Sequence, residues 1–146
     1  MAGSLTERFE SLLRMLLGKM VALYGNRLVS FVVFGSVGRK AMRPDSDIDF
    51  LLVVEDLPRG RLRRVAEFET IESEMRPHLE EAHGDGIYAA LSPVFKTPSE
   101  VRAGSPLFLD MVEDSRILYD KNDFFQKELD RMRALEEFGG KKNLER

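Results

Sequence analysis

Residues 31–54 read Phe-Val-Val-Phe-Gly-Ser-Val-Gly-Arg-Lys-Ala-Met-Arg-Pro-Asp-Ser-Asp-Ile-Asp-Phe-Leu-Leu-Val-Val. Two apolar, β-branched runs enclose a segment of glycine, serine and charged residues. Their composition predicts two buried strands, one at 28–34 and one that starts at Asp47 or just before it and runs to Val54. The chain breaks at Gly35 and turns again at 43–46, where proline, aspartate and serine gather. The stretch therefore predicts two strands with polar residues where the first ends and the second begins.

The turn after the first strand has the features of a phosphate-binding site. Gly35 has no Cβ, so the backbone can turn sharply and approach a ligand. Ser36 is expected to cap a short helix whose free N–H groups point back at the turn. Arg39 and Lys40 add positive charge beside the backbone that runs from Gly35 to Gly38. The alternative is that the glycines only form a turn and the two cations are ordinary surface charges.

Two carboxylates open the second strand. Asp47 and Asp49 lie two residues apart, so they point to the same face with Cα atoms about 7 Å apart. Ile48 and Phe50 point to the opposite face, into a core. Paired carboxylates repel unless a cation lies between them, and Mg²⁺ prefers such oxygen ligands together with substrate phosphates. Taken singly, each aspartate also suits a solvated turn or a half-exposed strand position.

The order of these residues resembles the signature of the polymerase-beta-type nucleotidyltransferase superfamily, and most of all its minimal, MNT-like branch. The similarity is carried by Gly35-Ser36, by Arg39 and by Asp47-Ile-Asp49. It implies a nucleotidyltransferase-like fold in which Ser36 and the nearby backbone hold a triphosphate. It also implies that Asp47 and Asp49 bind Mg²⁺, with Mn²⁺ as an alternative ion, and that the substrate is an NTP, with ATP as the first choice.

The resemblance also implies a third carboxylate, and the sequence departs from the pattern here. The third strand, predicted at 86–95, contains no aspartate or glutamate. Asp85 precedes it, and Ser92 or Tyr88 is a candidate for the equivalent place. Since the third carboxylate is implied to act as the base on the incoming hydroxyl, its absence could leave metal and nucleotide binding intact while the chemistry slows or stops.

These observations lead to one expected function and two alternatives. The expected function is Mg²⁺-dependent transfer of a nucleoside monophosphate from an NTP to a hydroxyl of a protein or small molecule. One alternative is a nucleotide-binding pseudo-enzyme that lacks the third carboxylate. The other is an antitoxin-like binding partner of a helical HEPN-domain protein, because the resemblance implies that some MNT-like proteins act in this way.

Composition limits the classes of protein to consider. The chain has 146 residues, 43% of them hydrophobic and 32% charged, with a formal net charge of −3. This suits one α/β (α+β) domain at 1–140 followed by a polar tail at 141–146, and it does not favour broad nucleic-acid binding. There is no cysteine, no apolar run of membrane length and no signal-peptide pattern, so we expect a cytoplasmic protein without a membrane partner. A homodimer is possible.

Helical periodicity predicts helices on either side of the central stretch. The first runs from Leu5 to Tyr24, between a Ser4–Glu7 capping box and Gly25-Asn26. The second runs from about 61 to 75, with Pro77 and a looser segment at 78–86 after it. Its expected apolar residues recur every three positions, and four arginines crowd its start, where a helix disfavours positive charge. A partner, a polyanion or a solvated face would each account for these arginines. The apolar residues are Leu62, Val65, Phe68 and Ile71, and the arginines are Arg59, Arg61, Arg63 and Arg64.

The remaining elements complete a small mixed sheet of about four strands with helices packed on it. One helix is predicted to start at Thr97-Pro98 and another to span residues 107–112. A strand predicted at 116–120 is the last member of the sheet. A final amphipathic helix is predicted from 123 to 138 and is stopped by Gly139-Gly140. Asp110 and Asp114 suit a helix face or a cap, and a site role is the alternative. The two histidines, His78 and His83, suit a solvated surface better than a transition-metal site.

Overall fold

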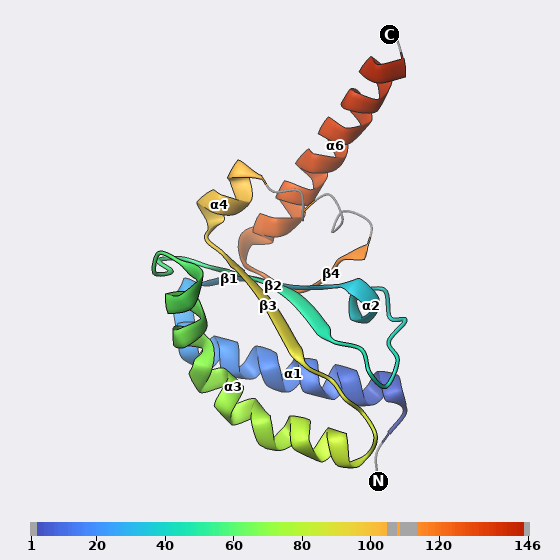
Figure 1. Ribbon diagram of the computed structural model, residues 1–146. Helices are drawn as coiled ribbons and strands as arrows, with labels where there is room; N and C mark the ends of the chain where they lie inside the picture. The colour runs from blue at the N-terminus through green and yellow to red at the C-terminus, as the bar shows by residue number, and fades with distance from the viewer. Residues whose placement is uncertain (1–2, 105–107, 109–113, 145–146) are drawn as a thin grey trace.

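The computed structural model describes residues 3–104, 108 and 114–144, and a four-stranded sheet forms its centre (Figure 1). The strand order is β3-β2-β1-β4. β1 pairs with β2 and with β4 in antiparallel fashion, whereas β2 and β3 are parallel. The predicted mixed α/β sheet is therefore confirmed, and its strands are β1 (Leu28–Phe34), β2 (Ile48–Val54), β3 (Leu91–Lys96) and β4 (Arg116–Asp120).

Helices cover both faces of the sheet. The long helices α1 (Leu5–Tyr24) and α3 (Arg61–Gly84) lie on one face, and α3 is the crossover that parallel strands require (Figure 1). On the other face lie α4 (Pro98–Ala103) and α6 (Phe124–Leu144), and α6 projects away from the body. The short elements are α2 (Gly35–Gly38) and the 3-10 turns η1 (Gly25–Arg27) and η2 (Lys121–Asp123).

Strand side chains alternate between two cores, as the period of a strand requires. Phe50 points toward α1 and α3, where its ring meets Phe31 edge-on with centroids 5.4 Å apart. Leu51 points to the other side and packs in a smaller core with Phe125 and Leu129 of α6. Both central strands are buried on two faces, which explains their near-continuous apolar sequence.

Two predicted helix starts are confirmed by their caps. Ser4 Oγ accepts a hydrogen bond from the backbone N–H of Glu7 at 3.1 Å, and α1 begins at the next residue. At α4, Thr97 and Glu100 form a complete capping box, with Pro98 in the first turn. None of the helices in the described ranges is long and apolar enough to cross a membrane.

Three sequence-based predictions around α3 are wrong. The helix does not end near 75 but continues through Pro77 to Gly84. Proline removes one helical hydrogen bond, yet Met75 and Ala82 are buried on either side of it, so packing outweighs that loss. The third strand begins at Leu91 rather than at Gly86. Leu62, expected on the apolar face, is 85% exposed, because six residues of helix place it about 120° around the axis from Phe68.

The final helix also differs from its prediction. α6 runs through Gly139-Gly140 to Leu144, so the glycines do not stop it. A glycine costs a helix only about 1 kcal/mol relative to alanine, and it does not forbid helical dihedral angles. The helix predicted at 107–112, together with Asp110, lies outside the described residues apart from Phe108, which is helical and buried.

Candidate active site at the ends of β1 and β2

The antiparallel pairing of β1 and β2 brings the predicted turn and the predicted carboxylates together. Phe34, the last residue of β1, lies opposite Asp49. Gly35 follows with φ +66°, and a Cβ added to it would lie 2.7 Å from Asp49 Oδ2. The glycine therefore serves two local purposes, since it adopts a left-handed conformation and leaves room for the carboxylate of the neighbouring strand.

Ser36 lies inside α2 rather than at its cap, which corrects the sequence-based prediction. The helix begins one residue earlier, at Gly35, and Phe34 precedes it without a side-chain cap. The Ser36 hydroxyl instead donates to Ser46 Oγ at 3.0 Å, and Ser46 Oγ accepts the backbone N–H of Arg43 at 2.7 Å. These bonds tie α2 to the turn before β2.

The two cations of the predicted turn are both exposed and leave it in different directions. Arg39 Nη1 lies 3.4 Å from Asp114 Oδ2, just before β4. A Cβ at Gly38 would lie 2.5 Å from the backbone oxygen of Asp114, so glycine is needed for this approach. Lys40 lies close enough to Glu10 of α1 for its charge to affect that carboxyl group. The pKa of Glu10 is lowered mainly by a hydrogen bond from Arg116, and the charge of Lys40 adds to the lowering.

The two predicted metal-binding carboxylates have different surroundings. Asp47 is exposed and precedes β2, which starts one residue later because the N–H of Ile48 makes the first bond to Ala90 O. Asp49 is half-buried, and burial raises its pKa; the charge of Asp47 adds to the rise, and a hydrogen bond from Ser92 opposes it. Among residues 3–104, 108 and 114–144, neither aspartate forms an ion pair.

The parallel register places Ser92 directly opposite Asp49. Of the two residues that the sequence offers for the place of the implied carboxylate, Ser92 and Tyr88, Ser92 is therefore the one that lies opposite Asp49. Asp85 is engaged elsewhere, in an ion pair with Arg8 at 2.9 Å. Tyr88 is 57% exposed, and its ring contacts that of His83 with centroids 5.3 Å apart. Within the described part of the chain, no group of three or more metal-binding side chains comes together.

Comparison with known proteins identifies the family. The family model for the nucleotidyltransferase domain matches residues 13–137, which is most of the chain. The chain belongs to the nucleotidyltransferase domain family. The sequence resemblance to nucleotidyltransferases is thereby confirmed, and the segment that contains Gly35-Ser36 and Asp47-Ile-Asp49 lies inside the matched region.

Individual relatives agree with this assignment. A protein of Methanocaldococcus jannaschii named "Putative protein adenylyltransferase MJ1305" is 28% identical over 114 residues, which cover 77% of this chain and 72% of the relative. Two mutant forms of the toxin–antitoxin MntA–HpeT each have a TM-score of 0.52. They are 12% and 14% identical, and the alignments cover 88% of this chain and 90% and 89% of theirs, which shows a shared nucleotidyltransferase fold.

Sequence reasoning missed Ser46 as a member of this arrangement. It belongs to the turn 43–46, and it is 9% exposed because its hydroxyl joins the turn to α2. A serine in a polar turn carries no sequence signal for such a contact. The pairing of Arg39 with Asp114 was equally hidden, because the two residues are 75 positions apart.

Proposed function

We propose that this nucleotidyltransferase transfers a nucleoside monophosphate from an NTP, with ATP as the first choice, to a hydroxyl of a protein in a Mg²⁺-dependent reaction. One observation carries the proposal: the Asp49 carboxylate lies against Gly35, the glycine that opens the turn predicted to bind phosphate. The family assignment and the name of the archaeal relative support a nucleotidyl transfer to protein.

The donor set at Asp47 and Asp49 suits a hard divalent cation. Neither carboxylate has an ion-pair partner among the described residues, so both have unused oxygen lone pairs. Mg²⁺ completes its shell with waters and phosphate oxygens. Mn²⁺ suits the same ligands. When bound, such an ion would neutralise charge on the phosphates and on the leaving group.

The other residues of the site would bind and orient the nucleotide. Ser36 and the backbone from Gly35 to Gly38 would hold the β- and γ-phosphates, and Arg39 would exchange its exposed contact with Asp114 for the triphosphate. Lys40 would contribute charge from the side of α1. In the reaction, the acceptor oxygen bonds to the α-phosphorus, and the bond from the α-phosphorus to the oxygen that bridges it to the β-phosphate breaks. The hydroxyl proton passes to water, and pyrophosphate leaves with the bridging oxygen.

Calorimetric titration of ATP and of each other NTP, with and without Mg²⁺, tests the binding part of the proposal. We expect binding that requires the divalent ion and that Asp47→Asn/Asp49→Asn abolishes. Asp45→Asn is the matched control, because Asp45 lies next to the site but is exposed, and its one ion pair among the described residues is with Arg43 at 3.7 Å. Absence of binding for every NTP, or equal loss in the control, would contradict the proposal.

The transfer itself needs an acceptor, and a helical HEPN-domain protein is the first one to test. Two structures that share this fold are mutant forms of the toxin–antitoxin MntA–HpeT, in line with the antitoxin-like alternative drawn from the sequence. Incubation with labelled ATP and such a protein should label the acceptor at a hydroxyl. Stable co-purification without labelling would favour the antitoxin-like binding role over the enzyme.

Ser92 favours one further candidate, a protein that binds nucleotide without transferring it. A serine opposite Asp49 cannot act as a carboxylate base. Under this alternative, Ser92→Asp should turn a labelling-inactive protein into an active one, whereas Ser92→Ala should leave it inactive. If the unchanged protein already labels its acceptor and Ser92→Asp gives no increase, the pseudo-enzyme alternative is excluded.

A further inference from the structure

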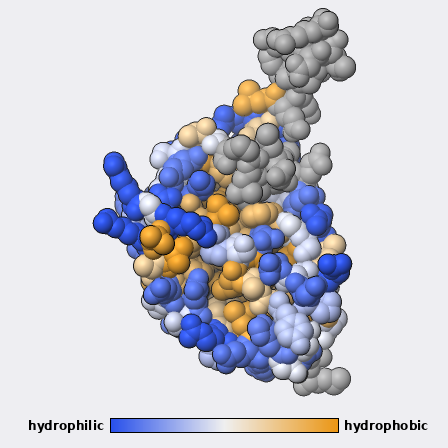
Figure 2. All heavy atoms as spheres, in the orientation of Figure 1, coloured by the Kyte–Doolittle hydropathy of each residue, from blue (hydrophilic) through white to orange (hydrophobic). Residues whose placement is uncertain are grey.

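We propose that the beginning of α3 is a docking surface for an acidic protein segment that carries an exposed apolar side chain. The surface, called here the arginine surface, consists of Arg59, Arg61, Leu62, Arg63 and Lys96. Its centre is a leucine that is 85% exposed. Figure 2 shows hydrophilic side chains projecting from the molecule in this region, where α3 begins in Figure 1, with a hydrophobic patch beside them.

The positive charges of the arginine surface are not neutralised by neighbours. Across the described ranges, no ion pair involves any of its three arginines or Lys96. The acidic residues closest in sequence are Glu55 and Asp56 before Arg59, Glu67 after Arg63 and Glu100 after Lys96. Of these, Glu67 is paired with Arg27 and Glu100 with Arg64. The chain as a whole carries −3, so this local excess of positive charge stands out.

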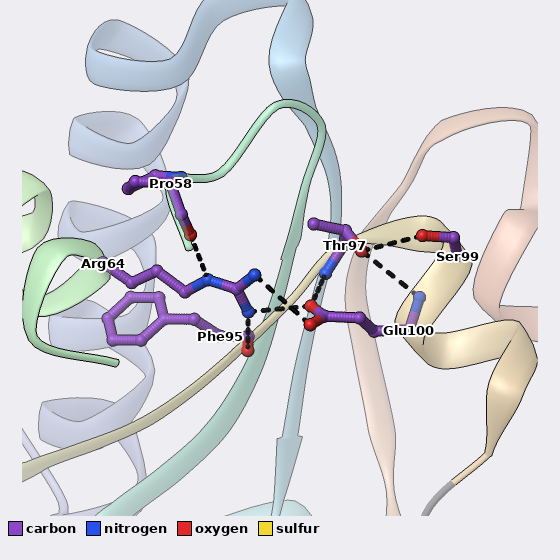
Figure 3. A network of polar contacts seen from close by, with 6 residues as sticks. All are labelled: Pro58, Arg64, Phe95, Thr97, Ser99 and Glu100. Atoms are coloured by element: carbon purple, nitrogen blue, oxygen red, sulfur yellow. Dashed lines mark hydrogen bonds and ion pairs between the residues drawn. The ribbon is translucent and has the colours of Figure 1, made fainter. Parts of the chain in front are cut away.

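Arg64 gives the surface a fixed base. Its guanidinium donates to Pro58 O at 2.7 Å, to Phe95 O at 3.2 Å and to both oxygens of Glu100 at 2.7 and 3.3 Å (Figure 3). Glu100 Oε1 also accepts the backbone N–H of Thr97 at 2.8 Å. These bonds join the turn before α3, the end of β3 and the start of α4. The backbone segments that carry the arginine surface are therefore held in fixed positions relative to one another.

A shallow hollow of about 300 Å³ opens beside the arginine surface. Its charged lining residues are Arg61, Arg64, Lys96 and Glu100, and its apolar ones are Val94 and Phe95. Glu100 is already paired with Arg64. The hollow lets an apolar side chain of the partner lie between cations, while Leu62 offers a second apolar contact. An acidic segment with an apolar anchor therefore matches both the charge and the shape of this surface.

The same features favour a protein over a nucleic acid. Cations at the first turn of a helix are unfavourable, because the helix dipole is positive there, and an acidic partner removes this cost. Nucleic-acid binding rests on phosphate contacts and gains little from an exposed leucine. An acidic protein segment gains from the arginines and from Leu62 together.

The arginine surface is separate from the candidate active site. It lies beyond the C-terminal end of β2, whereas Asp49 lies near the other end of that strand, and the rise of a strand places Asp49 about 17 Å from Val54. Binding at the arginine surface therefore does not depend on the proposed nucleotide chemistry. It would hold a partner at a fixed place relative to the site.

Fluorescence anisotropy with labelled peptides tests the inference. The probe is a peptide of glutamate and leucine, and its matched control has serine in place of every leucine. We expect the leucine-containing peptide to bind saturably at low salt, and Arg61→Glu/Arg63→Glu to weaken it by more than about tenfold. Leu62→Ser should weaken binding several-fold without a change of charge. Arg76→Glu, further along the same helix, should have little effect on affinity.

Three results would overturn the inference. The first is equal binding of the leucine and serine peptides, which would show that binding at the surface is only non-specific charge attraction. The second is tighter binding of a single-stranded DNA oligonucleotide that Leu62→Ser does not weaken. The third is self-association by sedimentation that Arg61→Glu/Arg63→Glu abolishes. The charge-reversed variant should remain folded, because glutamate is favourable at the start of a helix, and circular dichroism checks this.

Discussion

Asp49 is the carboxylate of the candidate site whose pKa is shifted by its surroundings. Its carboxylate is half-buried beside Gly35, receives one hydrogen bond from Ser92 and has the charge of Asp47 as a neighbour. Burial and a like charge both disfavour the ionised form. In the protein without ligand, the ionised carboxylate therefore reduces stability, and a bound cation would reverse the sign of that effect.

This argument predicts how Asp49→Asn changes stability with pH. Because the pKa of Asp49 is raised in the folded state, the stability it contributes is present below the unfolded pKa and is lost as pH rises through the folded pKa. Thermal melts without divalent ions should therefore show Asp49→Asn more stable than the unchanged protein at neutral pH. The difference should vanish at about pH 3, below the ordinary aspartate pKa of 3.8. Destabilisation by Asp49→Asn at neutral pH would contradict this reading.

Gly35→Ala tests the steric part of the site. An alanine Cβ would lie 2.7 Å from Asp49 Oδ2, and φ +66° is unfavourable for a residue with a Cβ. We expect a loss of about 1–3 kcal/mol in the free energy of unfolding, together with loss of NTP binding. Gly18→Ala is the control, because Gly18 is exposed on α1 with nothing within 4 Å of an added Cβ. That change should stabilise the protein by about 0.5–1 kcal/mol.

At the scale of elements, Asp120 links β4, β1 and α6. Its carboxylate accepts the buried Ser30 hydroxyl at 2.6 Å and the backbone N–H groups of Phe125 and Gln126, both at 2.9 Å. The last two bonds satisfy donors of the first turn of α6, which the helix itself leaves unpaired. Asp120 thus orients α6 on the sheet.

Asp120→Ala should lower the free energy of unfolding by about 2–3 kcal/mol, because it removes a helix cap and leaves Ser30 buried without its partner. Urea titration followed by circular dichroism measures the change. Asp130→Ala, on the exposed side of the same helix, should cost less than about 0.5 kcal/mol. Similar costs for the two variants would show that the cap does not stabilise α6.

At the scale of the whole molecule, two ion pairs join distant parts of the chain. Glu10 of α1 meets Arg116 of β4 at 2.7 Å, and Glu100 of α4 meets Arg64 of α3 at the same distance. Hydrogen bonds from these arginines are the main reason why the pKa of each glutamate is lowered. The first pair joins a helix to the sheet, and the second joins helices that lie on opposite faces of the sheet.

These pairs predict an acid-sensitive component of stability. A lowered folded-state pKa contributes stability that is present above the unfolded value of 4.5 and is lost as pH falls through the folded pKa. Glu10→Gln/Glu100→Gln should therefore be less stable than the unchanged protein at neutral pH and lose less stability on acidification. Urea midpoints across the acidic range provide the measurement. Parallel pH profiles for the two proteins would contradict the assignment, and Glu69→Gln, exposed on α3, is the control.

The sequence by itself determined the local chemistry. The two apolar runs predict two buried strands, and the glycine at position 35 predicts the turn between them. The order of Gly35-Ser36, Arg39 and Asp47-Ile-Asp49 indicates the family. These features depend on residues close together in the chain, so local rules of turns and side-chain alternation are enough to predict them.

Only the tertiary structure decided what lies opposite these residues. The parallel register places Ser92 beside Asp49, packing carries α3 through Pro77, and the position of Leu62 around the helix leaves it exposed at the arginine surface. Each outcome depends on contacts between segments distant in sequence. Burial across the layers outweighs local propensity in α3, whereas at Leu62 no second layer is present to cover the side chain.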